Sequence, residues 1–183
     1  YLNLHKHKRQ TMETLKSVIR DIPDFPKEGI IFKDITPLLS DPVSFKKIID
    51  TLKARYKDNR IDQVVGVEAR GFIFASALAY ALGCGVVMVR KPGKLPYKTF
   101  QKTYSLEYGE DSVEIHQDAF KKGQNVVIID DVLATGGTLA ACIDLVNKNF
   151  EVNLIEVGFL IELDFLKGRQ KLGNASIYSM MHF

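Results

Sequence analysis

Apolar residues follow two alternating patterns along the chain, one typical of buried strands and the other of amphipathic helices. Short continuous apolar runs, which suit strands covered on both faces, lie at residues 64–67, 86–89 and 126–129, and residues 154–163 and 177–181 are interpreted as two further strands. Apolar residues at helical spacing lie at residues 42–56, 73–82 and 139–146. Asp41 followed by Pro42 favours a helix start, because aspartate caps helices and proline suits the first turn. Strands alternating with helices predict an α/β fold with a mainly parallel sheet flanked by helices.

The stretch between residues 90 and 112 departs from this alternation. It is rich in proline, glycine, lysine and tyrosine and has no continuous apolar run. Long connections of this kind are usually lids or binding loops. We therefore expect a long flexible loop here, extending from the sheet.

The organisation of the chain favours a single domain. The sequence contains no internal repeat, no low-complexity tract and no linker between two domains. Residues 1–11 precede Met12 and are basic, with a cluster at His5–Arg9. We expect residues 1–11 to form a flexible N-terminal extension and residues 12–183 to form one domain.

Composition and charge exclude several functional classes. The chain is 46% hydrophobic and 26% charged, as is typical of a globular protein, and its formal net charge of +3 is too small to indicate nucleic acid. No apolar run approaches the roughly 20 residues that a membrane span needs. The only cysteines are Cys84 and Cys142, which are too few and too far apart for a disulfide framework and fit a cytoplasmic location.

The chemistry is concentrated after the strand at residues 126–129. Two carboxylates, Asp130 and Asp131, come next, and a loop of small residues then leads into a helix. That loop consists of Ala134, Thr135, Gly136, Gly137 and Thr138. Ligands of α/β sheets bind at the carboxyl ends of strands, and glycines before a helix N-terminus let backbone N–H groups approach an anion. The loop therefore predicts a phosphate site, with the aspartates accepting hydrogen bonds from ribose hydroxyls.

Other interpretations of this run are weaker. A tight turn with helix-capping residues would explain the two glycines alone, but it does not explain the strand, carboxylates and loop together. The P-loop motif GxxxxGK[ST] is absent, and the only GxG, at residues 83–85, has Met88 where a third glycine belongs.

The run VVIIDDVLATGGT at residues 126–138 resembles the signature with which type I phosphoribosyltransferases bind phosphoribosyl diphosphate (PRPP). Further segments, in the family's order, resemble its adenine-specific members: FPKEGIIFKDIT at residues 25–36, EARGF at 68–72, RKPGKLP at 90–96 and YSLEYG at 104–109. The similarity extends from Met12 to the C-terminus. It implies the type I phosphoribosyltransferase fold with a small hood, and transfer of the 5-phosphoribosyl group of PRPP to adenine, which forms AMP and diphosphate in purine salvage.

The resemblance assigns the PRPP ligands. The loop residues 134–138 would hold the 5-phosphate, and Asp130 and Asp131 the ribose hydroxyls. The diphosphate would be bound by residues of two further segments. They are Glu68, Ala69, Arg70 and Gly71, followed by Arg90, Lys91 and Lys94.

The resemblance also assigns the adenine site and a catalytic group. Phe32 would stack on the purine, while the main chain of Ile31 and Lys33 reads its edge and Leu163 forms an apolar wall. Lys33 replaces the arginine commonest at this position. Glu107 would manage the proton on the purine nitrogens, as a catalytic residue. From the sequence alone, Phe32 and Leu163 could equally pack in the core, and Glu107 could be a surface glutamate.

The resemblance finally implies partners. Mg²⁺ should arrive on PRPP or diphosphate, with no metal site in the protein itself. The partners are then adenine, PRPP and a second copy of the chain, with no nucleic acid and no membrane. Cys84, Cys142, His116 and His182 are interpreted as structural.

Two alternatives stay open at this point. One is a phosphoribosyltransferase for another purine base, such as xanthine. The other is a PRPP-sensing regulator on the same fold, although such proteins usually add an N-terminal DNA-binding domain, for which the residues before Met12 are too few.

Overall fold

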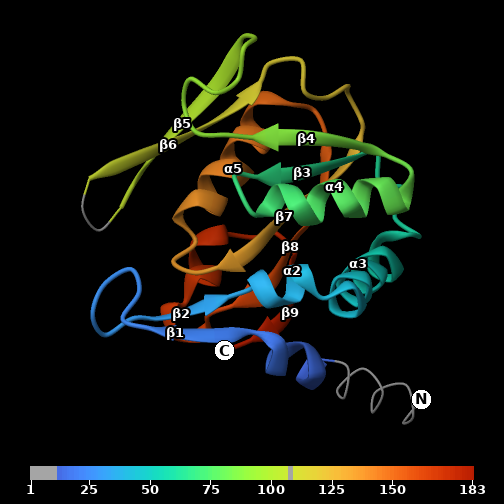
Figure 1. The fold of residues 1–183 in the computed structure, drawn as a ribbon. Helices are drawn as coiled ribbons and strands as arrows, with labels where there is room; N and C mark the ends of the chain where they lie inside the picture. Colours follow the sequence, from blue (N-terminus) through green and yellow to red (C-terminus); the bar gives the residue numbers. More distant parts are fainter. Residues whose placement is uncertain (1–11, 107–108) are drawn as a thin grey trace. The chain divides into compact units, whose positions relative to one another are not determined.

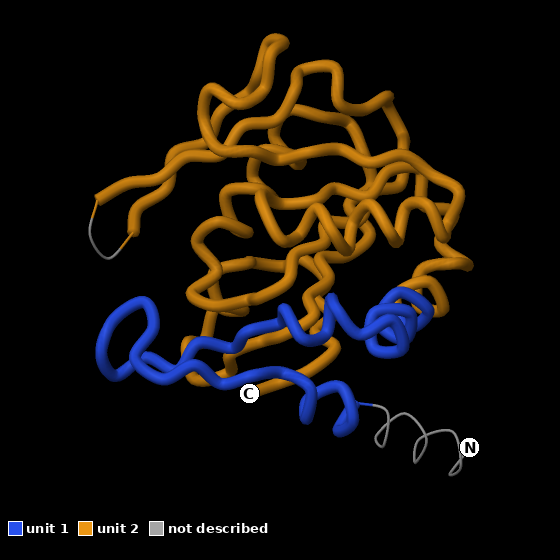
Figure 2. The backbone as a smooth tube through the Cα atoms, viewed as in Figure 1, with its two compact units in different colours: residues 1–51 blue, residues 52–183 orange. Residues whose placement is uncertain are grey.

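The computed structural model describes residues 12–106 and 109–183. The chain divides into two compact units, residues 1–51 and residues 52–183, which Figure 2 shows in different colours. The predicted N-terminal extension, residues 1–11, lies outside the described residues, and a single domain over residues 12–183 stays a prediction.

The first unit consists of short elements. Residues 12–18 are helical, and the strands β1 (Arg20–Pro23) and β2 (Ile31–Asp34) then form an antiparallel hairpin. The short helix α2 (Thr36–Ser40) precedes α3 (Pro42–Tyr56), which continues into the second unit. The backbone N–H of Ser44 donates to Asp41 Oδ2 at 2.8 Å, which confirms the predicted capping of α3 by Asp41.

The second unit is built on a five-stranded parallel sheet with the order β4-β3-β7-β8-β9 (Figure 1). Its strands are β3 (Gln63–Val67), β4 (Gly85–Val89), β7 (Asn125–Leu133), β8 (Asn153–Glu162) and β9 (Ile177–His182). The predicted apolar strands are therefore confirmed. The main difference is at β7, which continues through Asp130 and Asp131 to Leu133 instead of ending at Ile129.

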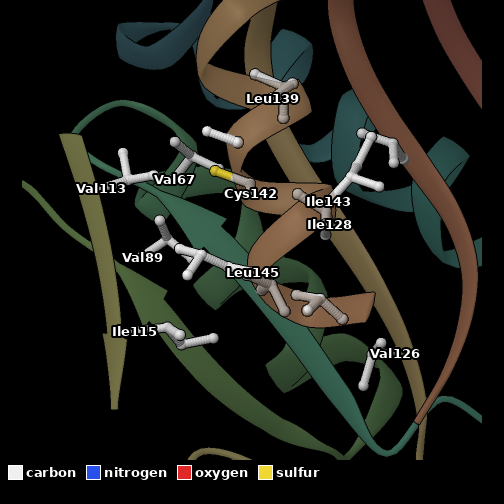
Figure 3. Close-up of a cluster of buried hydrophobic side chains, with 14 of the residues drawn as sticks. Val67, Val89, Val113, Ile115, Val126, Ile128, Leu139, Cys142, Ile143 and Leu145 are labelled. Atoms are coloured by element: carbon white, nitrogen blue, oxygen red, sulfur yellow. The ribbon is translucent and has the colours of Figure 1, made fainter. Parts of the chain in front are cut away.

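Helices cover both faces of this sheet. α5 (Gly137–Asn149) and residues of the β5–β6 hairpin build one continuous core with the sheet, where Figure 3 shows the sulfur of Cys142 among apolar side chains. α4 (Gly71–Leu82) lies over the other face, where Phe72 and Ala75 come closest to Gly66 of β3. Within the described ranges, no helix is both long enough and apolar enough to span a bilayer.

The expected long flexible loop is largely an antiparallel hairpin. Residues predicted as loop form β5 (Thr99–Ser105), which pairs with β6 (Glu110–His116). Val113 and Ile115 of β6 are buried in the core, and Phe100 of β5 packs against it. The prediction of a loop was wrong here because β5 has no fully buried residue and Glu114 separates the buried Val113 and Ile115 of β6. No continuous apolar run therefore marks the hairpin.

The connection from β8 to β9 contains two short 3₁₀ helices, η1 (Asp164–Leu166) and η2 (Gly168–Leu172). Lys167 joins them in a left-handed conformation, with φ of +53°. The chain thus reverses sharply, and Leu172 at the end of η2 is buried in the core.

Candidate active site

The predicted PRPP residues of the second unit gather at one edge of the sheet. Because β3, β4, β7 and β8 are parallel, their carboxyl ends lie on the same side (Figure 1). β3 leads into Glu68 and Arg70, β4 into Arg90, and β7 into Ala134. This edge is where ligands of open α/β sheets bind.

The loop after β7 ends in a helix N-terminus without a side-chain cap. Gly136, the N-cap of α5, has φ of +81° and no side chain with which to cap the helix. The first N–H groups of an α-helix have no partner within the helix and attract anions. Thr135 is exposed beside them. The loop can therefore hold a phosphate, as the sequence predicts.

The two carboxylates before the loop have different environments. Asp131 is buried, and its Oδ2 lies 2.6 Å from Nε of Arg70 in an ion pair. Asp130 Oδ1 accepts a hydrogen bond of 2.8 Å from the backbone N–H of Asp131. Burial above all, followed by the charge of Asp131, raises the pKa of Asp130 well above its usual range. Arg70 and the predicted ribose carboxylates thus lie together.

Glu68, which follows β3, binds the basic segment that follows β4. Its carboxylate accepts hydrogen bonds from Nε of Arg90 at 3.2 Å, the backbone N–H of Lys91 at 2.9 Å and Nζ of Lys94 at 2.7 Å. Partial burial raises the pKa of Glu68, but these donors outweigh it and lower the pKa to about 2. The peptide bond between Glu68 and Ala69 is cis. The structure therefore brings the predicted diphosphate residues of the two segments together.

Two residues of the β5–β6 hairpin, neither of them predicted as a site residue, contact residues that are predicted to bind PRPP. Asp111 forms an ion pair with Lys91. The hydroxyl of Tyr104 donates to Asp111 Oδ2 at 3.0 Å and lies 2.9 Å from Oγ1 of Thr138. The alternation of partly buried Phe100 and Tyr104 with exposed residues was the available signal for this hairpin.

The predicted adenine residues Ile31, Phe32 and Lys33 lie on β2 of the first unit. The rings of Phe25 and Phe32 meet edge to face, with centroids 5.2 Å apart. Nζ of Lys33 lies 2.7 Å from Oδ1 of Asp21 on the paired strand. The side chain that replaces the family's usual arginine is thus held within the hairpin.

The last two predicted site residues belong to the second unit. Leu163 follows β8 directly, and its N–H donates to the carbonyl of Leu133 at 3.0 Å, next to the start of the phosphate loop. It is half-buried. Glu107 lies outside the described residues.

One group of possible metal ligands occurs among the described residues. Potential ligand atoms of Glu162, Asp164 and His182 lie within 4.8 Å of one another. Both Arg169 and Ser179 donate hydrogen bonds to Glu162, however. A cation would therefore have to compete with a guanidinium for this carboxylate.

Comparison with known proteins identifies the family. A family model described as the phosphoribosyl transferase domain matches residues 35–172. The adenine phosphoribosyltransferase of Syntrophotalea carbinolica is 60% identical over 172 residues, which cover 94% of this chain and 100% of that protein. The adenine phosphoribosyltransferase of Geotalea daltonii is also 60% identical, with the same coverage.

Solved structures agree with this assignment. The crystal structure of the Thermoanaerobacter pseudethanolicus adenine phosphoribosyltransferase has a TM-score of 0.88 and 51% identity, covering 94% of this chain and 99% of that one. The Saccharomyces cerevisiae enzyme, solved with adenine and an imino-altritol bisphosphate, has a TM-score of 0.89 and 46% identity, with the same coverage. The chain has the type I phosphoribosyltransferase fold and belongs to the adenine phosphoribosyltransferases, the enzymes that transfer the 5-phosphoribosyl group of PRPP to adenine.

Proposed function

We propose that the residues at the carboxyl edge of the sheet carry out the reaction of this family, in which PRPP and adenine give AMP and diphosphate. The observation that carries the assignment is the loop after β7, where an uncapped helix N-terminus follows two carboxylates, one of them paired with Arg70. Anion-binding backbone and sugar-binding carboxylates are thus combined within one short segment.

Residues 134–138 are proposed to bind the 5-phosphate, and Asp130 and Asp131 the ribose hydroxyls. The position of Asp130 supports a role in hydrogen bonding, because the backbone N–H of Asp131 already holds its Oδ1 in place. The ion pair with Arg70 orients the carboxylate of Asp131. The two carboxylates can then accept hydrogen bonds from neighbouring ribose hydroxyls.

Arg70, Arg90, Lys91 and Lys94 are proposed to bind the diphosphate, with Glu68, Ala69 and Gly71 forming the loop around it. The leaving group gains negative charge as its bond to the sugar breaks, so fixed cations stabilise the transition state. The contacts of Arg90 and Lys94 with Glu68 support this role, because they hold two cations in place beside β3.

Mg²⁺ is proposed to enter as part of the PRPP complex. Mg²⁺ usually binds substrate phosphates and keeps few protein ligands. Of the two carboxylates next to the phosphate loop, Asp131 is already paired with Arg70, and the pKa of Asp130 is raised by burial. Neither is well suited to hold a divalent cation alone.

Adenine is proposed to stack on Phe32 and to be read by main-chain groups of Ile31 and Lys33, with Leu163 as an apolar contact. A backbone carbonyl accepts from the 6-amino group of adenine but repels a 6-oxo group. A base that leaves buried polar groups unpaired is rejected strongly. Glu107 is proposed as the group that manages the proton on the purine nitrogens.

This assignment predicts strict selectivity for the base. With Mg²⁺ and PRPP, purified protein should convert adenine to AMP, and kcat/KM for hypoxanthine, guanine and xanthine should be roughly 10⁴-fold lower. Product analysis by liquid chromatography, with each base alone and in competition, measures the difference. Comparable rates with any 6-oxopurine would refute the adenine assignment.

The protein is also proposed to act as a homodimer in the cytoplasm. α4 and the edge strand β4 expose several large apolar side chains, namely Ile73, Tyr80, Val86 and Met88. An exposed edge strand with apolar neighbours is a typical protein interface. The free thiols of Cys84 and Cys142 are compatible with the cytoplasm.

The proposed interface predicts that Met88→Glu shifts the protein toward monomers. A charge placed at an apolar contact would lose its hydration on association, so the dimer would be weakened. Sedimentation velocity across a concentration series measures the shift. Val43→Glu, at an exposed apolar residue of the first unit, is the control and should sediment like wild type. A Met88→Glu protein with wild-type sedimentation would place the interface elsewhere.

A further inference from the structure

The chain after β8 returns to the back of the phosphate loop. Lys167 reverses the chain in its left-handed conformation, and η2 begins at Gly168. Gly168 is buried, although both of its neighbours, Lys167 and Arg169, are exposed. Gly168 therefore packs against another segment of the second unit.

The segment that Gly168 contacts is the phosphate loop itself. A Cβ atom at Gly168 would overlap with the carbonyl oxygen of Ala134 and would lie 3.1 Å from the backbone N of Gly136. In the opposite direction, a Cβ atom at Gly136 would overlap with the carbonyl oxygen of Gly168 and would lie 3.0 Å from its carbonyl carbon. The two backbones are in direct contact, so the loop cannot move backward unless Gly168 moves too.

Gly168 is in turn fixed by the side chain of the next residue. Arg169 donates from Nε to Glu162 Oε1 at 3.0 Å and from Nη2 to Glu162 Oε2 at 2.5 Å. Glu162 is the last residue of β8 and its side chain is 7% exposed. Ser179 of β9 donates to Glu162 Oε2 at 2.5 Å. A rigid two-pronged contact thus anchors η2 to the sheet.

We infer that Glu162 and Arg169 are positioning residues for PRPP, which hold Gly168 against Ala134 and Gly136 and so fix the directions of the N–H groups in the phosphate loop. Neither residue is assigned to a substrate. The inference rests on the proposed function, because the loop must bind the 5-phosphate for its position to affect PRPP. A small displacement of a binding group can change a rate or an affinity by a large factor.

A second ion pair on the same strand provides a matched control. Arg55 donates from Nε and Nη2 to the two oxygens of Glu156 on β8, at 2.5 Å and 2.7 Å. The side chains of Arg55 and Glu156 are 40% and 8% exposed, against 44% and 7% for Arg169 and Glu162. Arg55 stacks on the ring of Tyr178 instead of neighbouring a loop glycine. The two pairs therefore match in chemistry and burial but differ in what they support.

The test compares Arg169→Lys with Arg55→Lys. Lysine keeps the charge but cannot form the two-pronged contact, so each variant loosens one pair. Arg169→Lys should raise KM for PRPP by about tenfold to a hundredfold and leave KM for adenine within about twofold of wild type. The two variants should lower Tm by similar amounts. Arg55→Lys, however, should leave both KM values unchanged. Titration calorimetry with ribose 5-phosphate should show the same contrast without turnover.

The outcomes separate this inference from the proposed function. If wild type fails to use PRPP, the proposed function is wrong. If wild type is active but Arg169→Lys keeps its KM for PRPP, or Arg55→Lys raises it equally, the positioning role is refuted. Should Arg169→Lys not fold, Ser179→Ala removes one donor to Glu162 and should raise only KM for PRPP. An unchanged KM in that variant would also overturn the inference.

Discussion

Gly136→Ala should remove most of the PRPP affinity of the protein and lower its stability. A residue with a side chain at φ of +81° costs about 1–2 kcal/mol. The added Cβ would also overlap with the carbonyl oxygen of Gly168, so the loop or η2 must shift. We expect a loss of about 2 kcal/mol or more, roughly 4–8 °C in Tm, together with at least a tenfold rise in KM for PRPP.

Gly83→Ala separates the cost of the backbone conformation from the collision. Gly83 has φ of +73° at the end of α4, and nothing lies within 4 Å of a Cβ atom built there. The Gly83→Ala variant should lose stability only through the strained backbone conformation, and its KM for PRPP should stay that of wild type. If the two variants lose equal stability and neither changes KM, contact with Gly168 is unimportant and the loop is only a turn.

Gly137→Ala tests the anion site with little effect on folding. Gly137 is the first residue of α5, and a Cβ atom there would lie 3.4 Å from the ring of Tyr104, within ordinary contact distance. Its Tm should therefore stay close to that of wild type. A methyl group at the helix N-terminus restricts the approach of a phosphate, so KM for PRPP should rise. A normal KM would contradict binding through the backbone at this position.

The central strands of the sheet, β3, β7 and β8, could be predicted because most of their residues on both faces are buried. The apolar runs of β3 and β7 are continuous, and only Glu156 interrupts that of β8 before its last residue; such runs need helices above and below them. Strand ends were less accurate, since β7 continues through Asp130 and Asp131 with no change in backbone pairing. Asp130 and Asp131 interrupt the apolar pattern near the carboxyl end of β7, although the strand itself continues to Leu133.

The hairpins could not be predicted in the same way. β1 and β2 are only four residues each, and no residue of either strand is buried. β5 exposes alternate residues. In short, largely exposed strands, the alternation of apolar and polar residues is weak, and a few polar residues at inward positions easily obscure it. The β5–β6 hairpin was therefore interpreted as a loop, although its position next to a binding site was anticipated.

The site could be predicted where one segment carries the chemistry, and it could not where distant segments meet. The motif at residues 126–138 predicted a phosphate loop on its own, and a loop does precede the uncapped N-terminus of α5. The contacts of Gly168 with that loop, and of Arg169 with Glu162, join parts of the chain that no local pattern links. A glycine that avoids a collision has no sequence signal of its own, because the neighbour that requires it is visible only in three dimensions.

Glu107→Gln should slow the chemical step and leave the fold intact. The residue follows Leu106 in the connection between β5 and β6, where the N–H of Leu106 donates to the carbonyl of Gly109 at 2.9 Å. Its assigned role is to manage the proton on the purine nitrogens, and an amide cannot take up a proton at neutral pH. We expect kcat to fall by roughly 10²–10⁴-fold, the usual range for a positioned acid or base, and Tm to stay unchanged. Glu110→Gln, at an exposed carboxylate that begins β6, is the matched control and should keep wild-type kcat.

Two roles of Glu107 give different patterns in this experiment. If it transfers a proton, single-turnover formation of AMP should slow as much as kcat does. KM for adenine should change little, because the proposed contacts with the base are made by other residues. If it only helps to close the site, the fall in kcat should be smaller. Water would then reach the reacting sugar, and PRPP hydrolysis without adenine should increase. Rapid-quench measurement of AMP, with a parallel assay of diphosphate release in the absence of adenine, distinguishes the two. A variant with a wild-type chemical step and no added hydrolysis would leave Glu107 as a solvated surface residue.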